Sequence, residues 1–161
     1  DNFENFSLEV WTKEIKVGLT GAMLCCKLIG SEMVKNKIKG NIVNIASDLS
    51  VIAPNQNIYK SKKGKFIKPV TYSVIKHGIV GLTKYLSTYW AEKDIKVNSL
   101  SPGSVLNNQP KEFVKNVNNL IPLGRMADKD EYKASILYML SDASKYMNGA
   151  IIPIDGGRSI W

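Results

Sequence analysis

Length, composition and charge narrow the classes of protein to which this chain can belong. Its 161 residues are 44% hydrophobic and 22% charged, which predicts one soluble globular domain with a real core. Its apolar runs, read from the sequence, are shorter than the ~18 residues of a membrane span, so we expect no membrane insertion. The net charge of +8 rests on lysine, because Arg125 and Arg158 are the only arginines. Proteins that read nucleic acid favour arginine, so we expect no nucleic-acid partner.

The two cysteines and the single histidine predict neither a disulfide nor a metal site. Cys25 and Cys26 are adjacent, so they cannot join distant segments, and the C-x-x-C spacing is absent. His77 is the only histidine, so no His/Cys cluster can hold zinc. We predict no metal, a reducing cytoplasmic location, helix-packing thiols and a solvent-side or interface position for His77.

The first predicted element is a long helix over residues 7–36. Ser7 is a suitable N-cap, and apolar residues follow it at steps of three and four. The residues of this apolar face are Trp11, Ile15, Leu19, Ala22, Cys26, Ile29 and Met33.

Three short β-branched runs have the pattern of buried parallel strands. They cover residues 41–47 (NIVNIAS), 95–101 (IKVNSLS) and 150–155 (AIIPID). Pro153 cannot donate to a β-ladder, which places the third strand near a sheet edge.

Helices are predicted between these strands. Residues 71–90 carry an apolar stripe, and a short helix is expected near 110–119. Asp128 and Glu131 have the capping-box spacing that opens a further helix through ASILYMLSDAS. The alternation of strands and helices predicts a single α/β domain built on a parallel sheet. The stripe of the 71–90 helix comprises Ile75, Ile79, Leu82, Leu86 and Trp90.

The segment YKSKKGKFIKP, residues 59–69, differs in composition from the rest of the chain. It holds five lysines in eleven residues, with a glycine in the middle, and we expect a mobile solvent loop. A functional alternative is an electrostatic lip that attracts an anionic substrate.

Tyr72 and Lys76 carry the clearest chemistry. They lie one helical turn apart at the margin of the 71–90 stripe, so both polar heads can point into one cleft beside the sheet. A fixed ammonium stabilises a phenolate and lowers the pKa of a tyrosine that is otherwise a poor acid or base at neutral pH. Ser47 ends the first strand, where open parallel sheets place their ligand crevice, and its hydroxyl can hold a substrate oxygen. Taken alone, Tyr-x-x-x-Lys also fits core packing beside a surface lysine.

The order of the motifs resembles the short-chain dehydrogenase/reductase family, whose marks include a Ser before a Tyr-x-x-x-Lys helix and a Pro-Gly after the next strand. The resemblance covers nearly the whole chain and implies hydride transfer between NAD or NADP and a carbonyl or alcohol substrate. The motifs that carry it are NIVNIAS, TYSVIKHGIVGLTKYLS, IKVNSLSPGSV, PLGR and NGAIIPIDGG.

The resemblance also implies roles for single residues. Tyr72 would be the general acid/base, Lys76 would lower its pKa and hold the nicotinamide ribose, and Ser47 would orient the substrate oxygen. The resemblance assigns further residues to the cofactor beside Tyr72 and Lys76: Ala46, Pro102, Gly103, Val105 and Asn107.

The chain departs from the family pattern in three places. KVGLTG has Gly18 where the family usually carries an Asn of a proton relay, which puts that relay in doubt. Asn107 stands where the family often has a Thr that contacts the carboxamide. The link between Ser47 and Tyr72 is longer than usual, and it is similar to insertions in relatives around flagellin or surface-sugar modification.

The first nucleotide-binding half of a Rossmann-type doubly wound sheet is expected to be absent from these residues. No Gly-x-x-x-Gly-x-Gly turn follows an N-terminal strand, GLTGAM lies inside a predicted helix, and DGG at 155–157 follows the last strand. We therefore expect residues 1–161 to be the C-terminal, catalytic and substrate-binding part of a longer enzyme, with little activity alone. The choice between NAD and NADP, and between a sugar-like and an acyl substrate, stays open.

Two expectations concern the whole protein. We expect a homodimer or homotetramer in which glycines let long helices of two subunits approach closely: Gly18, Gly21, Gly78 and Gly81. The alternative to an enzyme is a catalytically degenerate family member that acts as a binding or regulatory protein. Gly18 and the missing half favour that alternative, whereas the intact Ser47, Tyr72 and Lys76 oppose it.

Overall fold

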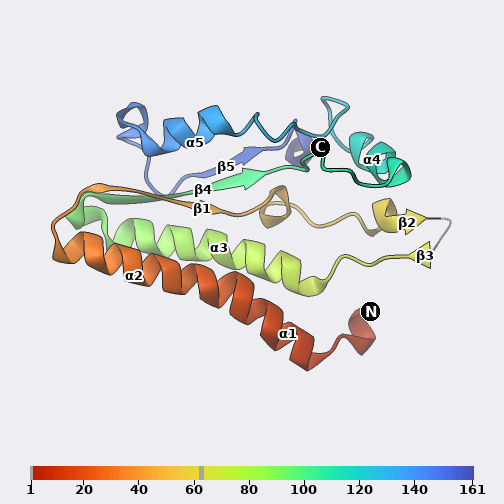
Figure 1. Cartoon of the computed structure of the whole chain (residues 1–161), viewed down its shortest axis with the longest axis horizontal. Helices are drawn as coiled ribbons and strands as arrows, with labels where there is room; N and C mark the ends of the chain where they lie inside the picture. Colours follow the sequence, from red (N-terminus) through yellow and green to blue (C-terminus); the bar gives the residue numbers. More distant parts are fainter. Residues whose placement is uncertain (1, 62–63) are drawn as a thin grey trace.

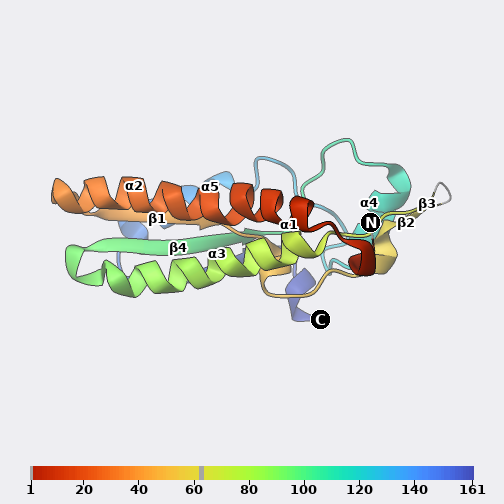
Figure 2. The ribbon, with the colours of Figure 1, turned by 90° about the horizontal axis from the view of Figure 1, so that it is seen from below.

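The computed structural model describes residues 2–61 and 64–161, and it has the layered α/β architecture expected from the sequence (Figure 1). A central parallel sheet has helices on both faces, with α2 and α3 on one side and α5 on the other (Figures 1 and 2). Its strands, in the order β1-β4-β5, are β1 (Gly40–Ile45), β4 (Ile95–Pro102) and β5 (Ile151–Ile154). The helices are α1 (Leu8–Ile15), α2 (Gly21–Lys35), α3 (Val70–Tyr89), α4 (Lys111–Asn118) and α5 (Lys133–Leu140).

Shorter elements connect these. A two-stranded antiparallel sheet is formed by β2 (Lys60–Ser61) and β3 (Gly64–Lys65). The 3₁₀ helices are η1 (Phe3–Asn5), η3 (Asp48–Ser50), η4 (Gln56–Tyr59), η5 (Ala91–Lys93), η6 (Asp142–Ser144) and η7 (Arg158–Ile160).

The register of the parallel sheet brings the carboxyl ends of its strands to one edge. β1 and β4 pair from Gly40↔Ile95 to Ile45↔Leu100, and β4 and β5 pair up to Pro102↔Ile154. β5 is an edge strand of the described sheet, which confirms the position expected from Pro153.

The central strand β4 carries both apolar and polar side chains that are fully buried. Ile95 and Val97 are fully buried among side chains of the α2 and α3 layer. Asn98 is fully buried as well, and its amide donates to the Met147 carbonyl at 3.0 Å and accepts from the Ala150 N–H at 2.9 Å. Because a buried amide must be satisfied, these two bonds fix how the chain enters β5.

The predicted long helix contains a π turn (η2, Lys16–Thr20) between α1 and α2. Gly18 lies in that turn, and a Cβ placed on it would come within 2.8 Å of Ile75 in α3. A Cβ on Gly78 would likewise come within 2.8 Å of Leu19. These two glycines therefore allow close packing within the chain, so the expectation that they serve contact between subunits is wrong.

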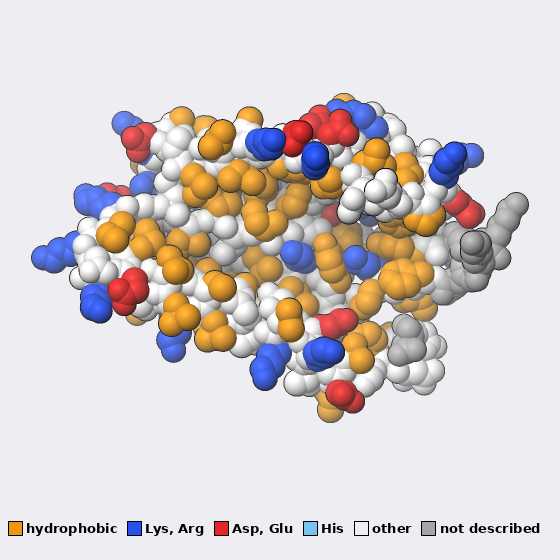
Figure 3. All heavy atoms as spheres, in the orientation of Figure 1, with side chains coloured by type: hydrophobic (Ala, Val, Ile, Leu, Met, Phe, Trp, Pro, Cys, Tyr) orange, Lys and Arg blue, Asp and Glu red, His pale blue; other side chains and the backbone are white. Residues whose placement is uncertain are grey.

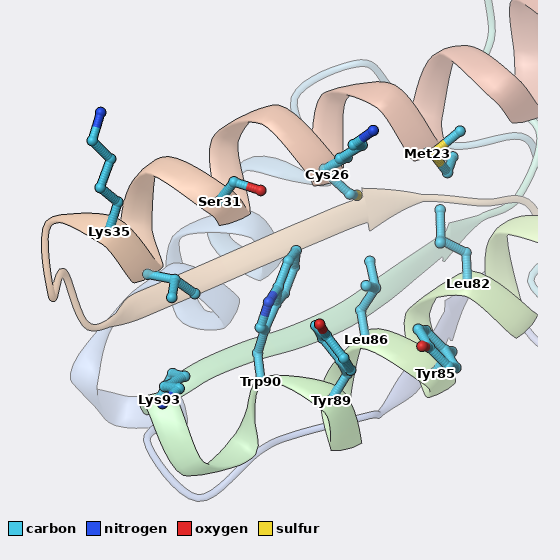
Figure 4. Close-up of a pocket in the computed structure, with 12 residues that line it drawn as sticks. Met23, Cys26, Ser31, Lys35, Leu82, Tyr85, Leu86, Tyr89, Trp90 and Lys93 are labelled. Atoms are coloured by element: carbon cyan, nitrogen blue, oxygen red, sulfur yellow. The ribbon is translucent and has the colours of Figure 1, made fainter.

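A groove of about 730 Å³ opens between the C-terminal parts of α2 and α3 (Figure 4). Trp90 points across it toward α2, and a Cβ on Gly30 would come within 2.0 Å of the indole. Tyr85 and Tyr89 lie along the α3 side, with stacked rings 5.7 Å apart. The groove thus has an aromatic wall and a floor closed by Trp90.

The face shown in Figure 3 is rich in hydrophobic side chains across its middle, where α2 and β1 lie in Figure 1. Exposed apolar residues of these elements include Leu24, Leu28 and Ile45. Apolar side chains gathered on one face mark a surface that folded proteins commonly cover with a partner or with another part of the chain.

The helix Leu8–Lys35 is 28 residues long with a mean hydropathy of 1.4 in its most apolar window, so by length and composition it can cross a membrane. Lys27 and Glu32 interrupt its apolar residues, so the uninterrupted runs are shorter than a membrane span, and the expected absence of membrane insertion stays a prediction. A single helix of this kind is weak support for a membrane, because core helices of soluble proteins have the same composition. The described residues bury 11% of that window.

The lysine-rich segment 59–69 has aromatic contacts near both of its ends, which the expectation of a mobile solvent loop did not include. The Tyr59 ring packs against Phe66 and against Phe113 of α4, with ring centres 5.5 Å apart in each pair. Lys62 and Lys63 of that prediction lie outside the described residues. The high lysine content of the segment concealed its aromatic anchors.

One of the two contacts of the predicted capping box forms, in a separate turn before α5. The Asp128 N–H donates to Glu131 Oε2 at 2.8 Å, as the spacing indicated. The α-helix itself begins at Lys133, without a side-chain cap. The prediction is therefore right about the contact and wrong about the helix start.

Three predicted exposures can be checked. Cys26 is buried and packs in the core, but Cys25 is exposed, so only one thiol packs a helix. Ile29 was assigned to the apolar face and is exposed. His77 is exposed in the single chain, which agrees with the predicted solvent-side or interface position.

Candidate active site

Ser47 follows β1 and is held in place by its neighbours. Its side chain is buried and accepts a hydrogen bond from the Leu49 N–H at 3.2 Å. Its hydroxyl donates to Asp48 Oδ1 at 2.9 Å. The serine oxygen is therefore fixed at the sheet edge where open parallel sheets bind ligands.

Tyr72 lies in the first turn of α3 and reaches Ser47. The Tyr72 hydroxyl is 3.4 Å from Ser47 Oγ, longer than an ideal O–H···O bond. Lys76 Nζ lies 5.8 Å from the centre of the Tyr72 ring and donates to the Ile45 carbonyl at 3.1 Å. The structure thus brings together the three residues that the sequence placed in one cleft.

Lys76 keeps hydrogen-bonding capacity for a ligand. Burial lowers the pKa of its ammonium below the usual value. Within residues 2–61 and 64–161, no carboxylate forms an ion pair with it. An ammonium has three donors, and the Ile45 carbonyl occupies one.

An ion pair that the sequence reasoning missed lies directly behind Ser47. Arg158 Nη1 donates to Asp48 Oδ2 at 2.8 Å, and the two side chains are only 5% and 4% exposed. The other oxygen of Asp48 accepts from Ser47 and from the Leu49 N–H at 2.8 Å. Two signals were available: Asp48 adjoins Ser47, and Arg158 is one of two arginines in the chain.

Lys68 is a second missed residue. Its ammonium lies 3.6 Å from the centre of the Tyr72 ring, closer than that of Lys76. The signal was its spacing, because Lys68 precedes Tyr72 by four residues as Lys76 follows it by four. Tyr72 is therefore flanked by a lysine on each side along the chain.

Three of the residues assigned to the cofactor lie at the carboxyl ends of β1 and β4. Ala46 is buried, and its N–H donates to the Leu100 carbonyl at 2.8 Å, so only its carbonyl and methyl can face a ligand. Pro102 ends β4, and the Gly103 N–H donates to the Ile154 carbonyl at 2.9 Å.

Val105 and Asn107 belong to a loop braced by Gln109, which the sequence reasoning did not single out. The Gln109 side chain donates to the Val105 carbonyl and accepts from the Asn107 N–H, both at 2.7 Å. Asn107 is exposed, and in the described part of the chain no hydrogen bond joins it to Tyr72 or Ser47. The structure therefore places Asn107 outside the cluster formed by the three central residues.

These donors suit one end of a nicotinamide dinucleotide. Tyr72 and the two uncommitted donors of Lys76 can bind ribose hydroxyls beside the strand ends. No glycine-rich turn joins a strand to a helix N-terminus in the part of the chain that the structure describes. The described residues therefore fit the nicotinamide ribose and not the pyrophosphate.

Two hollows of the structure are lined by residues other than Ser47, Tyr72 and Lys76. A cavity of about 160 Å³ at the ends of β4 and β5 is lined in part by Gly103 and Tyr132. The larger groove between α2 and α3 is remote from Ser47 and Tyr72. We assign the site by its proton-transfer groups, because a cavity between two helices carries no such chemistry.

Comparison with protein-family models decides the family. The model described as enoyl-(acyl carrier protein) reductase matches residues 1–159. The chain belongs to the short-chain dehydrogenase/reductase family.

Several members of this family match the chain along nearly its whole length. D-threitol dehydrogenase of Mycolicibacterium smegmatis is 33% identical, over 98% of the chain and 57% of the relative. NAD-dependent glycerol dehydrogenase of Listeria innocua is 34% identical, over 98% of the chain and 59% of the relative. The crystal structure of a short chain dehydrogenase from Leptospira borgpetersenii with bound NAD+ has a TM-score of 0.91 at 32% identity, covering 99% of the chain and 60% of that protein. The chain thus spans less than two thirds of the length of these relatives.

Proposed function

We propose that the whole protein containing this chain is an NAD(P)-dependent oxidoreductase that interconverts an alcohol and a carbonyl compound. The observation that carries the proposal is the contact of the Tyr72 hydroxyl with Ser47 Oγ at 3.4 Å, with Lys76 one turn away. The dehydrogenase names of its relatives support the same activity.

In the reducing direction, the Tyr72 O–H bond breaks and its proton moves to the substrate oxygen, which becomes the new hydroxyl. The Lys76 ammonium stabilises the phenolate that this transfer leaves. Ser47 orients the substrate oxygen, for which its hydroxyl must turn away from Asp48. The nicotinamide supplies the hydride for reduction or accepts it for oxidation when it is bound.

For the substrate we propose a polyhydroxylated, sugar-like molecule. Relatives named for threitol and glycerol support this class. The acyl alternative is supported only by the description of the matching family model.

Replacing Tyr72 by Phe tests the proposal. General acid/base catalysis contributes about 10²- to 10⁴-fold, so Tyr72→Phe should lower kcat by at least about 100-fold with substrate binding retained. Tyr85→Phe is the control, because Tyr85 is exposed on the same helix. Turnover is followed in the whole protein as reduced nicotinamide, over a panel of polyols and polyhydroxylated acids with NAD+ or NADP+. Equal rates for the two variants would exclude Tyr72 as the acid/base.

We propose that the rest of the whole protein supplies the first nucleotide-binding half of the fold. The incomplete coverage of the relatives and the exposed apolar side chains of α2 and β1 support this. We expect residues 1–161 alone to have little activity. For the whole protein we expect a cytoplasmic location and assembly into a homodimer or homotetramer. Robust NAD(P)H turnover by the isolated 161 residues would contradict the first of these.

A catalytically degenerate binding protein is the second candidate. It is favoured by Gly18, because Ile75 occupies the space that a relay Asn side chain would need. The absence of turnover in the whole protein across the panel, with retained cofactor binding, would favour it over the enzyme.

A further inference from the structure

The proposed chemistry leaves one charged group at the site without a role. The Lys68 ammonium lies 3.6 Å from the centre of the Tyr72 ring, over the aromatic face of the residue whose hydroxyl would exchange a proton with the substrate. A cation on an aromatic face is a favourable contact, but it does not hydrogen-bond the three N–H donors of an ammonium.

The backbone of Lys68 is held in place by one side chain. Gln56 Oε1 accepts from the Lys68 N–H at 2.9 Å, and Gln56 Nε2 donates to the Lys68 carbonyl at 3.3 Å. Pro69 follows, which restricts Lys68 to an extended conformation. Because two hydrogen bonds and Pro69 hold the Lys68 backbone, the residue is positioned before any ligand arrives, which lowers the entropic cost of binding.

The charge of Lys68 is not balanced by a contact. Burial lowers the pKa of its ammonium, while the carboxylate of Asp48 acts in the opposite direction. Asp48 is already bound to Arg158, and no carboxylate lies within ion-pair distance of Lys68 among residues 2–61 and 64–161. Lys68, Lys76 and Arg158 therefore outnumber the one acidic side chain of the cluster.

We propose that Lys68 binds an anionic group of the substrate, a carboxylate or a phosphate, so that the substrate is a polyhydroxylated acid and not a neutral polyol. This inference rests on the proposed function, because it places the reacting oxygen at Tyr72. The ammonium lies over the Tyr72 ring, so the anionic group is only a few carbon atoms from the reacting alcohol. Lys68 is thus a specificity residue, whereas Lys76 serves the proton transfer.

The test compares binding of three matched compounds to the whole protein by calorimetry, with and without NAD+. Glucitol is neutral, gluconate carries a carboxylate and glucitol 6-phosphate carries a phosphate. We expect the protein to bind at least one acid more tightly than glucitol. Lys68→Met should weaken the binding of that acid by about 10- to 100-fold, as for a lost charge-assisted hydrogen bond. The same substitution should change the affinity for glucitol by less than about twofold.

Two variants control for folding and for general charge. Lys68→Arg should keep most of the preference for the acid. Lys84→Met removes an exposed lysine of α3 and should leave all three affinities unchanged. The melting temperature of each variant shows whether it is folded.

The outcomes separate this inference from the proposed function. If the wild type binds neither acid better than glucitol, or if Lys68→Met weakens all three compounds equally, Lys68 does not recognise an anion. If the acid preference depends on Lys68 but no compound is oxidised, the anion site stands and the oxidoreductase proposal fails. The acid that responds to Lys68→Met identifies carboxylate or phosphate as the group.

Discussion

Arg158 and Asp48 form an ion pair that has left water almost completely. Two charges that are only 5% and 4% exposed lose most of their hydration, and their mutual attraction offsets that cost only while both are present. The same carboxylate accepts a hydrogen bond from the Ser47 hydroxyl. The pair therefore links the stability of the C-terminal segment to the position of a catalytic candidate.

Removing one partner should be more damaging than removing both. Arg158→Met leaves Asp48 buried without compensation, and we expect the free energy of unfolding to fall by about 3–5 kcal/mol in urea denaturation. The double variant Asp48→Asn, Arg158→Met should recover part of this loss. Arg125→Met removes an exposed ion pair and serves as the control. A single variant as stable as the control would show that the buried pair is not coupled in this way.

The ion pair between Glu131 and Arg125 depends on pH. Two hydrogen bonds from Arg125, both 2.7 Å long, and one from the Asp128 N–H lower the pKa of Glu131 from 4.5 to about 2. Because the pKa of Glu131 is lower in the folded state, its ionised carboxylate stabilises the folded protein. This stabilisation is fully present above pH 4.5 and is lost as the pH falls toward about 2.

The prediction for Glu131 is a carboxyl NMR titration with its midpoint near 2. Arg125→Gln should raise that midpoint toward 4.5. Lys133→Gln, which removes the neighbouring contact with Asp130, should leave it unchanged. A wild-type midpoint near 4.5 would mean that the Arg125 contact does not form in solution.

At the scale of elements, two glycines in long helices have opposite surroundings. Gly30 of α2 faces Trp90, and an added Cβ would lie 2.0 Å from the indole. Gly81 of α3 has no heavy atom within 4 Å of such a Cβ. We expect Gly30→Ala to destabilise the protein by about 1–3 kcal/mol through overpacking. Gly81→Ala should stabilise it by up to about 1 kcal/mol through helix propensity. Thermal unfolding of both variants checks this, and equal stabilities would show that Trp90 can move away.

The elements that could be predicted from the sequence are those specified by local pattern. The β-branched runs around Ile42 and Val97 predicted two neighbouring strands because a parallel strand buried on both faces needs them. The glycines of the first helix indicated a close approach, but no local signal says which helix approaches, and Gly18 turned out to face Ile75 of the same chain. In the lysine-rich segment, composition outweighed the aromatic anchor Tyr59.

The residues of the candidate site also divide into those that a local sequence pattern specifies and those that only the assembled fold brings together. Ser47 and Tyr72 were predicted because each lies at a marked point of a local motif, the end of a strand or the start of a helix. Arg158 was not predicted because it meets Asp48 across 110 residues of sequence, and only the assembled fold brings them together.

At the scale of the whole molecule, β1, like β5, lacks a neighbouring strand on one side within the described residues. The N–H groups of Gly40 and Ala46 donate toward β4, so by strand periodicity those of Ile42 and Asn44 do the same. The N–H groups of Val43 and Ile45 therefore point to the open edge. An open edge beside exposed apolar side chains is a surface that proteins normally cover.

Hydrogen exchange along β1 tests whether the rest of the whole protein pairs with this edge. In the isolated 161-residue chain, the Val43 and Ile45 amides should exchange faster than those of Ile42 and Asn44, because only the latter two are bonded to β4. In the whole protein, an added strand should protect Val43 and Ile45 to the level of their neighbours. Measuring at several protein concentrations controls for self-association along the edge. If Val43 and Ile45 exchange equally fast in both samples, no strand pairs with β1, and the proposed first half of the fold must lie elsewhere.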